Sequence, residues 1–282
     1  MRVAISLSGY FRLYEHLLEN FYTLLINPIK EYAEVDIFFS TWNKLNSSEC
    51  FSVKHGNAGW NKYPDFNKEE ILKSYAPKKY IIGDFEREKN KFNILNYDKT
   101  LDTNTLHKDI HNNGLLFCLT QYYHRFLANQ LKQEYEKEND FKYDLVISMR
   151  PDLFFLTPFN ITKINKEKLS LRTIYNDAFL VSSSEMDDKI SALFPNIQRI
   201  VDKYKRNKVE WFELYCPEWW LENHYDDIGV TMEQRAEIGE DLFWYYPRSL
   251  FLEFCYEIYK KTNQAEKISY PIDYFKKLGL LK

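Results

Sequence analysis

The chain has 282 residues, with 45% hydrophobic and 28% charged side chains, and it carries a net charge of -3. This length and apolar content allow a sizeable core, so a globular protein is expected rather than a disordered one. The charge balance offers no overall attraction to nucleic acid, although a local basic groove stays open. The aromatic share of 17% fits either stacking surfaces for sugars and bases or an AT-rich coding sequence.

The cysteines and the apolar runs indicate a cellular setting. The four cysteines lie far apart, which is typical neither of a zinc site nor of a dense disulfide framework. The apolar run at residues 3–7 is too short for a signal peptide, and no stretch approaches the roughly 20 apolar residues of a membrane span. We therefore expect reduced thiols, no membrane span and a cytoplasmic location.

The first part of the chain predicts a strand, a helix and a second strand. Residues 3–7 form an aliphatic run that opens into a glycine turn at residues 8–9, as a buried strand does. Apolar residues at helical spacing predict a helix over 13–25 that ends before Pro28. Residues 35–42 lack clean alternation, which is expected for a strand covered on both faces. This order is typical of a nucleotide-binding α/β domain.

The middle of the chain alternates between loops and short elements. Residues 43–64 are polar and predict a long loop. A short helix over 67–75 follows, with Asn67 as its cap and Glu70 three residues on. A short strand is predicted at 79–82.

A second amphipathic helix leads into the centre of the chain. Residues 85–113 have few apolar positions and predict an excursion from the core. Helical spacing over 115–132 predicts a helix, and the charged run at 132–140 is expected to solvate its end. His124 on this helix, like His16 on the first, is expected to be structural or exposed, because neither has a partner at metal-ligand spacing.

Residues 141–155 hold the most informative stretch. Residues 145–147 are too short an apolar run for a helix, and Pro151 cannot continue a central strand, so a buried strand should end at Arg150. Arg150 and Asp152 thus arrive at the carboxyl end of a strand, where ligands of open α/β sheets bind. Asp152 can hold a divalent cation, and Arg150 can meet a phosphate bidentately. Alternatively, Asp152 ties down the turn and Arg150 forms a structural ion pair.

The remaining chain predicts further elements without an internal repeat. A strand is expected at 178–182, a helix over 187–204 and helical structure over 211–225. The pair Trp219 and Trp220 suits either the core or a stacking surface for an acceptor sugar.

Several well-known signatures are missing from the sequence. It contains no G-x-G-x-x-G, no Walker A loop, no H-E-x-x-H and no G-x-S-x-G. These absences disfavour dinucleotide dehydrogenases, P-loop kinases, zinc proteases and α/β-hydrolases. Carboxylates and arginines at strand ends are what remains to carry chemistry.

Four segments, in order, resemble a group of bacterial and viral glycosyltransferases of the GT-A type. They are residues 4–12 (AISLSGYFR), 36–42 (DIFFSTW), 143–153 (YDLVISMRPDL) and the Asn-Asp pair at 176–177. The resemblance implies an α/β, GT-A-like (Rossmann-like) fold, in which helices flank a mostly parallel central sheet and the C-terminal part is more helical. It implies one domain over 1–282, with a nucleotide-sugar-binding half at 1–155 and an acceptor-side half at 156–282.

The resemblance also implies a nucleotide-sugar donor and a set of substrate-binding residues. In this sequence Arg150 stands in place of the first Asp of the D-x-D signature, and Asp152 in place of its last. The expected substrate-binding residues are Ser8, Gly9, Tyr10, Arg12, Thr41, Trp42, Arg150 and Asp152.

The chemistry of sugar transfer assigns roles to the charged residues. Transfer from a nucleoside diphosphate builds negative charge on the departing phosphate, which a cation, Arg or Lys must stabilise. Asp152 is therefore the candidate ligand for Mn²⁺ or Mg²⁺, unless arginine replaces the metal, and Arg150 and Arg12 are candidate phosphate contacts. Arg12 follows the glycine turn at a helix start, where backbone N–H groups favour anions, or else it is a solvated first-turn residue.

An inverting transfer also needs a carboxylate base, whereas a retaining one does not. Asp177, just before a predicted strand, and the pair Glu240 and Asp241 at a helix start are the catalytic candidates, and one member of that pair is expected to be a cap. The expected acceptor is a surface glycan, with a modified base of viral DNA as the alternative. Two alternatives from other classes are a catalytically silent nucleotide- or sugar-binding protein and a methyltransferase. A methyltransferase would need a first turn richer in glycine than Ser8-Gly9.

Overall fold

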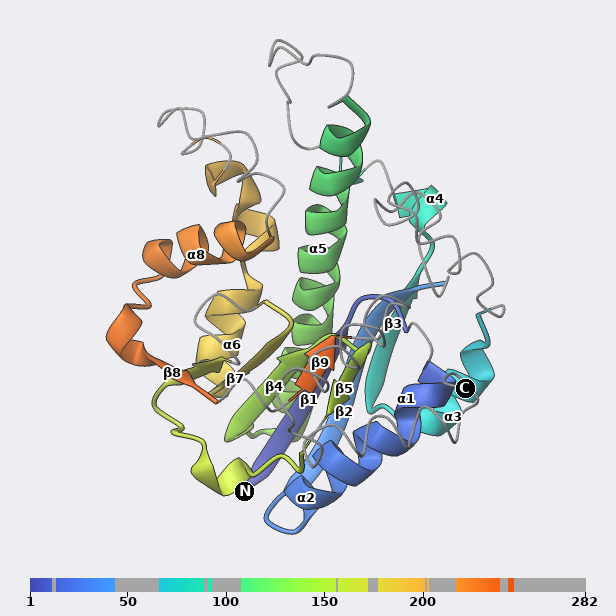
Figure 1. Ribbon diagram of the computed structural model, residues 1–282, viewed down its shortest axis with the longest axis vertical. Coiled ribbons are helices and arrows are strands. Elements are labelled where there is room, and N and C mark those ends of the chain that lie inside the picture. Colours follow the sequence, from blue (N-terminus) through green and yellow to red (C-terminus); the bar gives the residue numbers. More distant parts are fainter. Residues whose placement is uncertain are drawn as a thin grey trace, which may run out of the picture.

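The structure is a computed structural model that describes residues 1–11, 14–43, 66–88, 91–92, 108–155, 157–171, 177–200, 202, 217–238 and 243–245. Within these ranges the chain forms a seven-stranded sheet, a two-stranded sheet and flanking helices (Figure 1). The fold class is α/β, as the sequence predicts. The long loop predicted at residues 43–64 lies, after its first residue, outside the described residues.

The large sheet is mostly parallel. Its strand order is β3-β2-β1-β4-β7-β6-β8. Within it, β7 runs antiparallel to both of its neighbours, and every other pair is parallel. The strands are β1 (Arg2–Ser8), β2 (Glu34–Trp42), β3 (Lys79–Gly83), β4 (Leu145–Met149), β6 (Leu169–Leu171), β7 (Phe179–Ser182) and β8 (Arg235–Glu237).

The order of the first four strands creates a reversal beside β1. From β1 the chain proceeds to β2 and β3 on one side, whereas β4 pairs with β1 on the other side. In open α/β sheets, ligands bind in the crevice beyond the carboxyl ends of the strands at such a reversal. The fold therefore singles out the ends of β1 and β4.

A small second sheet links distant parts of the chain. It pairs β5 (Leu153–Phe155) with β9 (Phe243–Tyr245) in antiparallel fashion. The strands of the large sheet likewise come from both predicted halves, because β6, β7 and β8 follow residue 156. The division into a donor half and an acceptor half stays a prediction.

The first helix continues past the proline at which we expected it to end. It runs as α1 (Tyr14–Phe21), a π-helical segment η1 (Tyr22–Ile26) and α2 (Asn27–Lys30). Pro28 lies in the first turn after the wider π segment, where its missing N–H removes no needed hydrogen bond. The next helix, α3 (Lys68–Tyr75), begins as predicted, with the side chain of Asn67 accepting from the backbone N–H of Glu70 at 3.1 Å.

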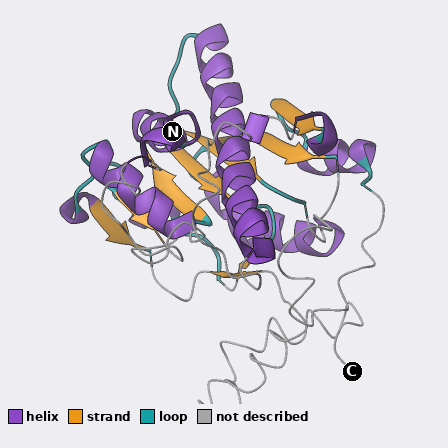
Figure 2. Ribbon diagram, turned by 90° about the horizontal axis from the view of Figure 1, so that it is seen from above, coloured by secondary structure: helices purple, strands orange, loops and turns teal. Residues whose placement is uncertain are grey.

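Helices cover both faces of the sheet. Successive strand residues point to opposite sides, so each strand contributes apolar side chains to both layers of helices. Val3, Ile5 and Leu7 of β1 belong to an apolar cluster shared with α1, α2 and α3. Ala4 belongs to a cluster on the opposite face, where Leu131 of α5 (Lys108–Asn139) packs. Seen from above, the strands lie between these helices (Figure 2). The core predicted from the apolar runs is thus a layered one.

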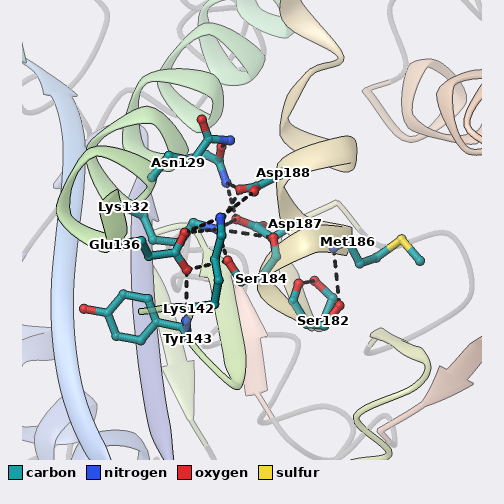
Figure 3. A network of polar contacts seen from close by, with 12 residues as sticks. Asn129, Lys132, Glu136, Lys142, Tyr143, Ser182, Ser184, Met186, Asp187 and Asp188 are labelled. Carbon is teal, nitrogen blue, oxygen red and sulfur yellow. Dashed lines mark hydrogen bonds and ion pairs between the residues drawn. The ribbon is translucent and has the colours of Figure 1, made fainter. Parts of the chain in front are cut away.

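Helix α5 is longer than the predicted helix over 115–132. The charged run that we expected to be solvated is its last two turns, and Lys132 and Glu136 in it are almost fully buried. The Nζ atom of Lys132 donates to Ser184 Oγ at 2.6 Å and lies 2.7 Å from Asp188 Oδ1 (Figure 3). Burial raises the pKa of Asp187 beside it, against the opposing charge of Lys132. This network joins α5 to α6 (Ser184–Ser191). The expectation of a solvated helix end is confirmed for the exposed residues 137–140 but was wrong for Lys132 and Glu136.

The predicted helix over 187–204 is interrupted. Helix α6 ends at Ser191, and a 3-10 turn, η6 (Phe194–Asn196), with Pro195 in its first turn, comes before the helical residues 197–200. Further along, α8 (Pro217–Asp227) carries Trp220, which is fully buried in the apolar cluster between α5, α6 and α8. Of the two readings for this tryptophan, the structure bears out the core.

The shorter described elements complete the chain. They are α4 (Phe85–Glu88), η5 (Ile161–Lys163) and η8 (Met232–Gln234).

Candidate functional site

A pocket lies at the carboxyl ends of β1, β2 and β4, beside the reversal in strand order. Its cavity volume is about 30 Å³, whereas a single buried water needs roughly 10–15 Å³ on the same measure. The cavity therefore has room for more than one water. The residues that line it are Ser8, Gly9, Tyr10, Trp42, Thr120, Gln121, His124, Arg150, Pro151 and Asp152.

Six of the eight expected substrate-binding residues line this one pocket. They are Ser8, Gly9, Tyr10, Trp42, Arg150 and Asp152. Thr41 does not line it, because adjacent strand residues face opposite ways and Trp42 faces α5. Arg12 lies outside the described residues.

The glycine turn after β1 is shaped by its backbone. Gly9 has φ +112°, a conformation that side chains with a Cβ rarely adopt. Its N–H donates to the carbonyl of Ser40 at 3.2 Å, which ties the turn to the end of β2. The sequence predicted this turn from the Ser-Gly pair, and its place beside the pocket follows from β1 and β2 being parallel neighbours.

Arg150 and Asp152 form a bidentate ion pair. Nε of Arg150 donates to Oδ1 of Asp152 at 2.9 Å, and Nη2 donates to Oδ2 at 2.7 Å. The side chain of Arg150 is 20% exposed, whereas that of Asp152 is 4% exposed. The guanidinium is therefore the more accessible partner, and the more deeply buried carboxylate of Asp152 fixes its orientation.

This pairing bears on the expected metal. Both oxygens of Asp152 already accept from Arg150, so a cation bound there would have to displace the guanidinium. Among the residues that the structure describes, no group of three or more His, Cys, Asp or Glu side chains could hold a metal ion. In this arrangement the residues do not fit a metal site built on Asp152. The expectation of Mn²⁺ or Mg²⁺ stays a prediction.

Asp177 is not among the residues that line the pocket, but it contacts one of them. Its side chain is buried and accepts a hydrogen bond from Nε2 of Gln121, which lines the pocket. Its backbone carbonyl accepts from Nη2 of Arg125, a fully buried guanidinium on α5. The hydrogen bond from Gln121 thus connects Asp177 to the lining of the pocket. The other catalytic candidates, Glu240 and Asp241, lie outside the described residues, as does Asn176. The helix expected to begin at this pair was wrong for residues 243–245, which form strand β9 and pair with β5.

His124 is a pocket residue to which sequence reasoning gave no role. Its side chain is 1% exposed, and its Nδ1 atom lies 2.7 Å from Oγ of Ser40. Its ring meets that of Trp42 edge to face, with 4.2 Å between the centroids. Burial lowers the pKa of His124 to about 3, so the imidazole is neutral at physiological pH.

A signal for this side of the pocket was present in the sequence. Thr120, Gln121 and His124 are polar residues within the mostly apolar stretch at residues 115–127, and residues four apart lie on one helical face. Buried polar side chains are more informative than buried apolar ones. The three residues line the pocket because α5 packs across β1 and β2.

Among the described residues, no helix is both long and apolar enough to cross a membrane. No model of a known protein family matches the sequence, and no curated protein matches it significantly.

Proposed function

We propose that this chain is a GT-A-like glycosyltransferase that moves a sugar from a nucleoside diphosphate to an acceptor hydroxyl, with a surface glycan as the expected acceptor. The observation that carries the proposal is the convergence of segments far apart in the sequence. Residues 8–10, Trp42 and residues 150–152 line one pocket at the reversal of an open α/β sheet. Such a crevice is where this architecture binds nucleotides.

In the proposed chemistry, Arg150 stabilises the negative charge that develops on the departing diphosphate. In transfer, the bond between the anomeric carbon and the phosphate oxygen breaks, and the acceptor oxygen forms the new bond while its proton leaves. Negative charge then grows on the diphosphate, and an oriented guanidinium stabilises it through charge-assisted hydrogen bonds. Asp152 is in this proposal a positioning residue, because it holds Arg150 at two points.

The base remains a choice among three carboxylates. Asp177 would have to exchange its hydrogen bond from Gln121 for one from the acceptor hydroxyl. Glu240 and Asp241 stay predicted alternatives. An Asp177→Asn variant separates the cases, because it should abolish transfer without weakening donor binding if Asp177 is the base.

A thermal-shift panel tests the function. Nucleoside diphosphates and their sugars, with and without Mn²⁺, are compared with S-adenosylmethionine, since a ligand of the folded state adds about 2.7 kcal/mol of stability at 100 times its Kd. We expect a selective rise in Tm with one class of nucleoside diphosphate, and slow hydrolysis of the matching nucleotide sugar. A rise with S-adenosylmethionine alone would overturn the proposal in favour of a methyltransferase.

Matched variants locate the response. Arg150→Gln should lose most of the Tm rise with the diphosphate. Arg199→Gln is the control, because it also removes one positive charge and one ion pair, to Asp227 at 2.9 Å, but does not line the pocket. Binding without hydrolysis or transfer would point to a silent binding protein.

A further inference from the structure

The pairing of β4 with β7 brings Asp177 beside the pocket. At the end of this antiparallel ladder, the backbone N–H of Arg150 donates to the carbonyl of Ala178 at 3.0 Å. Pro151 follows Arg150 and lines the pocket, and Asp177 precedes Ala178, so these two are the next residues on the two chains. The candidate base therefore lies at the same strand end as the pair of Arg150 and Asp152.

Two residues of α5, one helical turn apart, hold Asp177 at separate points. Nη2 of the buried Arg125 donates to the main-chain carbonyl of Asp177, and Nε2 of Gln121 donates to Oδ2 of its side chain. An ionised carboxylate only accepts hydrogen bonds, so the amide nitrogen of Gln121, and not its oxygen, must face Asp177. The main chain of Asp177 is thus held independently of the bond to its carboxylate.

The bond from Gln121 is one that an incoming group can replace. Its donor is a neutral amide on a flexible side chain, whereas the carboxylate of Asp152 accepts two charge-assisted bonds from Arg150. The O–H of water or of an acceptor can donate to a carboxylate just as an amide N–H does. Gln121 lines the pocket, whose cavity has room for more than one water. Water and the amide are therefore alternative donors to Oδ2 of Asp177.

We propose that Gln121 shields Asp177 from water until an acceptor hydroxyl displaces its amide, which favours transfer of the sugar over hydrolysis of the donor. This inference rests on the proposed function for the nucleotide-sugar donor and for Asp177 as the base. In hydrolysis, a water gives a proton to Asp177, its oxygen bonds to the anomeric carbon, and the bond from that carbon to the diphosphate oxygen breaks. The amide opposes this step because it occupies the oxygen that would take the proton. An acceptor makes further contacts that offset the loss of the bond, whereas a water makes few.

Hydrolysis without an acceptor tests the inference, measured as release of nucleoside diphosphate from a panel of UDP- and GDP-sugars. The Gln121→Ala variant removes the donor and should hydrolyse its nucleotide sugar at least about tenfold faster than the wild type, since one hydrogen bond to a charged group is worth a factor of this order. A residue with only a structural role would slow hydrolysis when it is lost. Gln121→Met keeps the length of the side chain, cannot donate, and should also accelerate hydrolysis.

A matched control lies on the same helix. Gln133→Ala also removes a glutamine whose Nε2 donates a hydrogen bond, to Oδ1 of Asn129 at 2.8 Å, but Gln133 does not line the pocket. Its rate of hydrolysis should equal that of the wild type. Adding Asp177→Asn to Gln121→Ala should remove the gain, because the base that accepts the proton is lost.

The outcomes separate the inference from the proposed function. Hydrolysis no faster in Gln121→Ala and Gln121→Met than in the wild type would overturn the inference and leave the proposed function intact. A gain that survives Asp177→Asn would also overturn it, because another group would then activate the water. Absence of hydrolysis in every variant, together with no Tm response to any nucleoside diphosphate, would overturn the proposed function as well.

Discussion

The guanidinium of Arg150 donates two hydrogen bonds, 2.9 Å and 2.7 Å long, to the carboxylate of Asp152 at the carboxyl end of β4. The two residues are separated only by Pro151, so the pair closes across the turn that ends the strand. A glycosyltransferase-like sequence led us to expect a metal ligand at residue 152. In the structure this carboxylate instead orients an arginine toward the pocket that it lines.

Replacing Asp152 with asparagine should loosen Arg150. The variant keeps the size of the side chain but removes its charge, so the guanidinium loses a charge-assisted, bidentate partner. We expect stability to fall by about 1–3 kcal/mol in chemical denaturation, because a hydrogen bond to a charged group is lost. Diphosphate affinity should fall as well. Unchanged affinity for diphosphate would show that the orientation of Arg150 has no part in binding.

Removing divalent cations should leave nucleotide binding intact. Both oxygens of Asp152 are engaged, and Arg150 supplies positive charge. Treatment with EDTA is therefore expected not to reduce the Tm rise caused by the nucleoside diphosphate that binds best. Binding that requires Mn²⁺ would contradict this expectation and would mean that a cation displaces the guanidinium from Asp152.

Replacing Gly9 with alanine should disturb the pocket through the backbone. No atom lies within 4 Å of the added Cβ, so the cost comes from φ +112°, which is strained for any residue with a Cβ. A loss of about 1–3 kcal/mol is expected in denaturant unfolding. Gly229→Ala is the matched control, since its φ is +76° and it lies outside the pocket lining. Only Gly9→Ala should also weaken nucleotide binding.

The buried His124 should make the fold sensitive to acid. Its pKa is lowered to about 3 in the folded state from the ordinary 6.5, because burial disfavours the charged form. Between these values the unfolded chain binds the proton and the folded chain does not, so the free energy of unfolding falls as the pH falls. One proton contributes a slope of about 1.4 kcal/mol per pH unit.

The His124→Phe variant should lose that slope between about pH 6 and pH 4. Urea denaturation at several pH values measures it. The buried His224, whose pKa is also lowered by burial, remains in the variant, so some acid sensitivity should persist. An unchanged slope would mean that His124 titrates normally in the folded protein.

The Lys132 network should carry stability rather than ligand binding. Replacing the fully buried Lys132 with methionine leaves the buried Asp187 without its cation, while Glu136 and Asp188 keep only the exposed Lys142. Removing one partner of a buried ion pair costs about 3–5 kcal/mol, which should appear as a large drop in Tm. Lys142→Met is the control, because the side chain of Lys142 is 57% exposed and its loss should cost less than about 1 kcal/mol.

The affinity of the folded Lys132→Met protein for the nucleoside diphosphate that binds best should match that of the wild type. The lysine bonds to residues of α6 and does not line the pocket. Calorimetry at a temperature below the lowered Tm checks this. A changed affinity would mean that the α5 and α6 junction shapes the pocket.

Sequence alone determined the strand ends that surround the pocket. Apolar runs bounded by Gly9 and Pro151 have a local physical cause, since glycine permits the turn and proline ends the strand. The helix cap at Asn67 is equally local and was confirmed. These signals sufficed to predict an α/β fold and to direct attention to residues 8–9 and 150–152, whereas Tyr10 and Trp42 were expected only from the resemblance to glycosyltransferases.

Tertiary structure alone decided how the polar residues pair. Lys132 looked solvated within a charged run, yet its partners Ser184 and Asp188 lie more than fifty residues on. His124 acquired a place in the pocket because α5 packs across β2, which brings it to Ser40. Periodicity and propensity report on neighbours along the chain, whereas burial and charge pairing depend on which strands adjoin. The sequence therefore placed Arg150 close to the metal ligand expected at Asp152, but it could not show that the guanidinium points at this carboxylate.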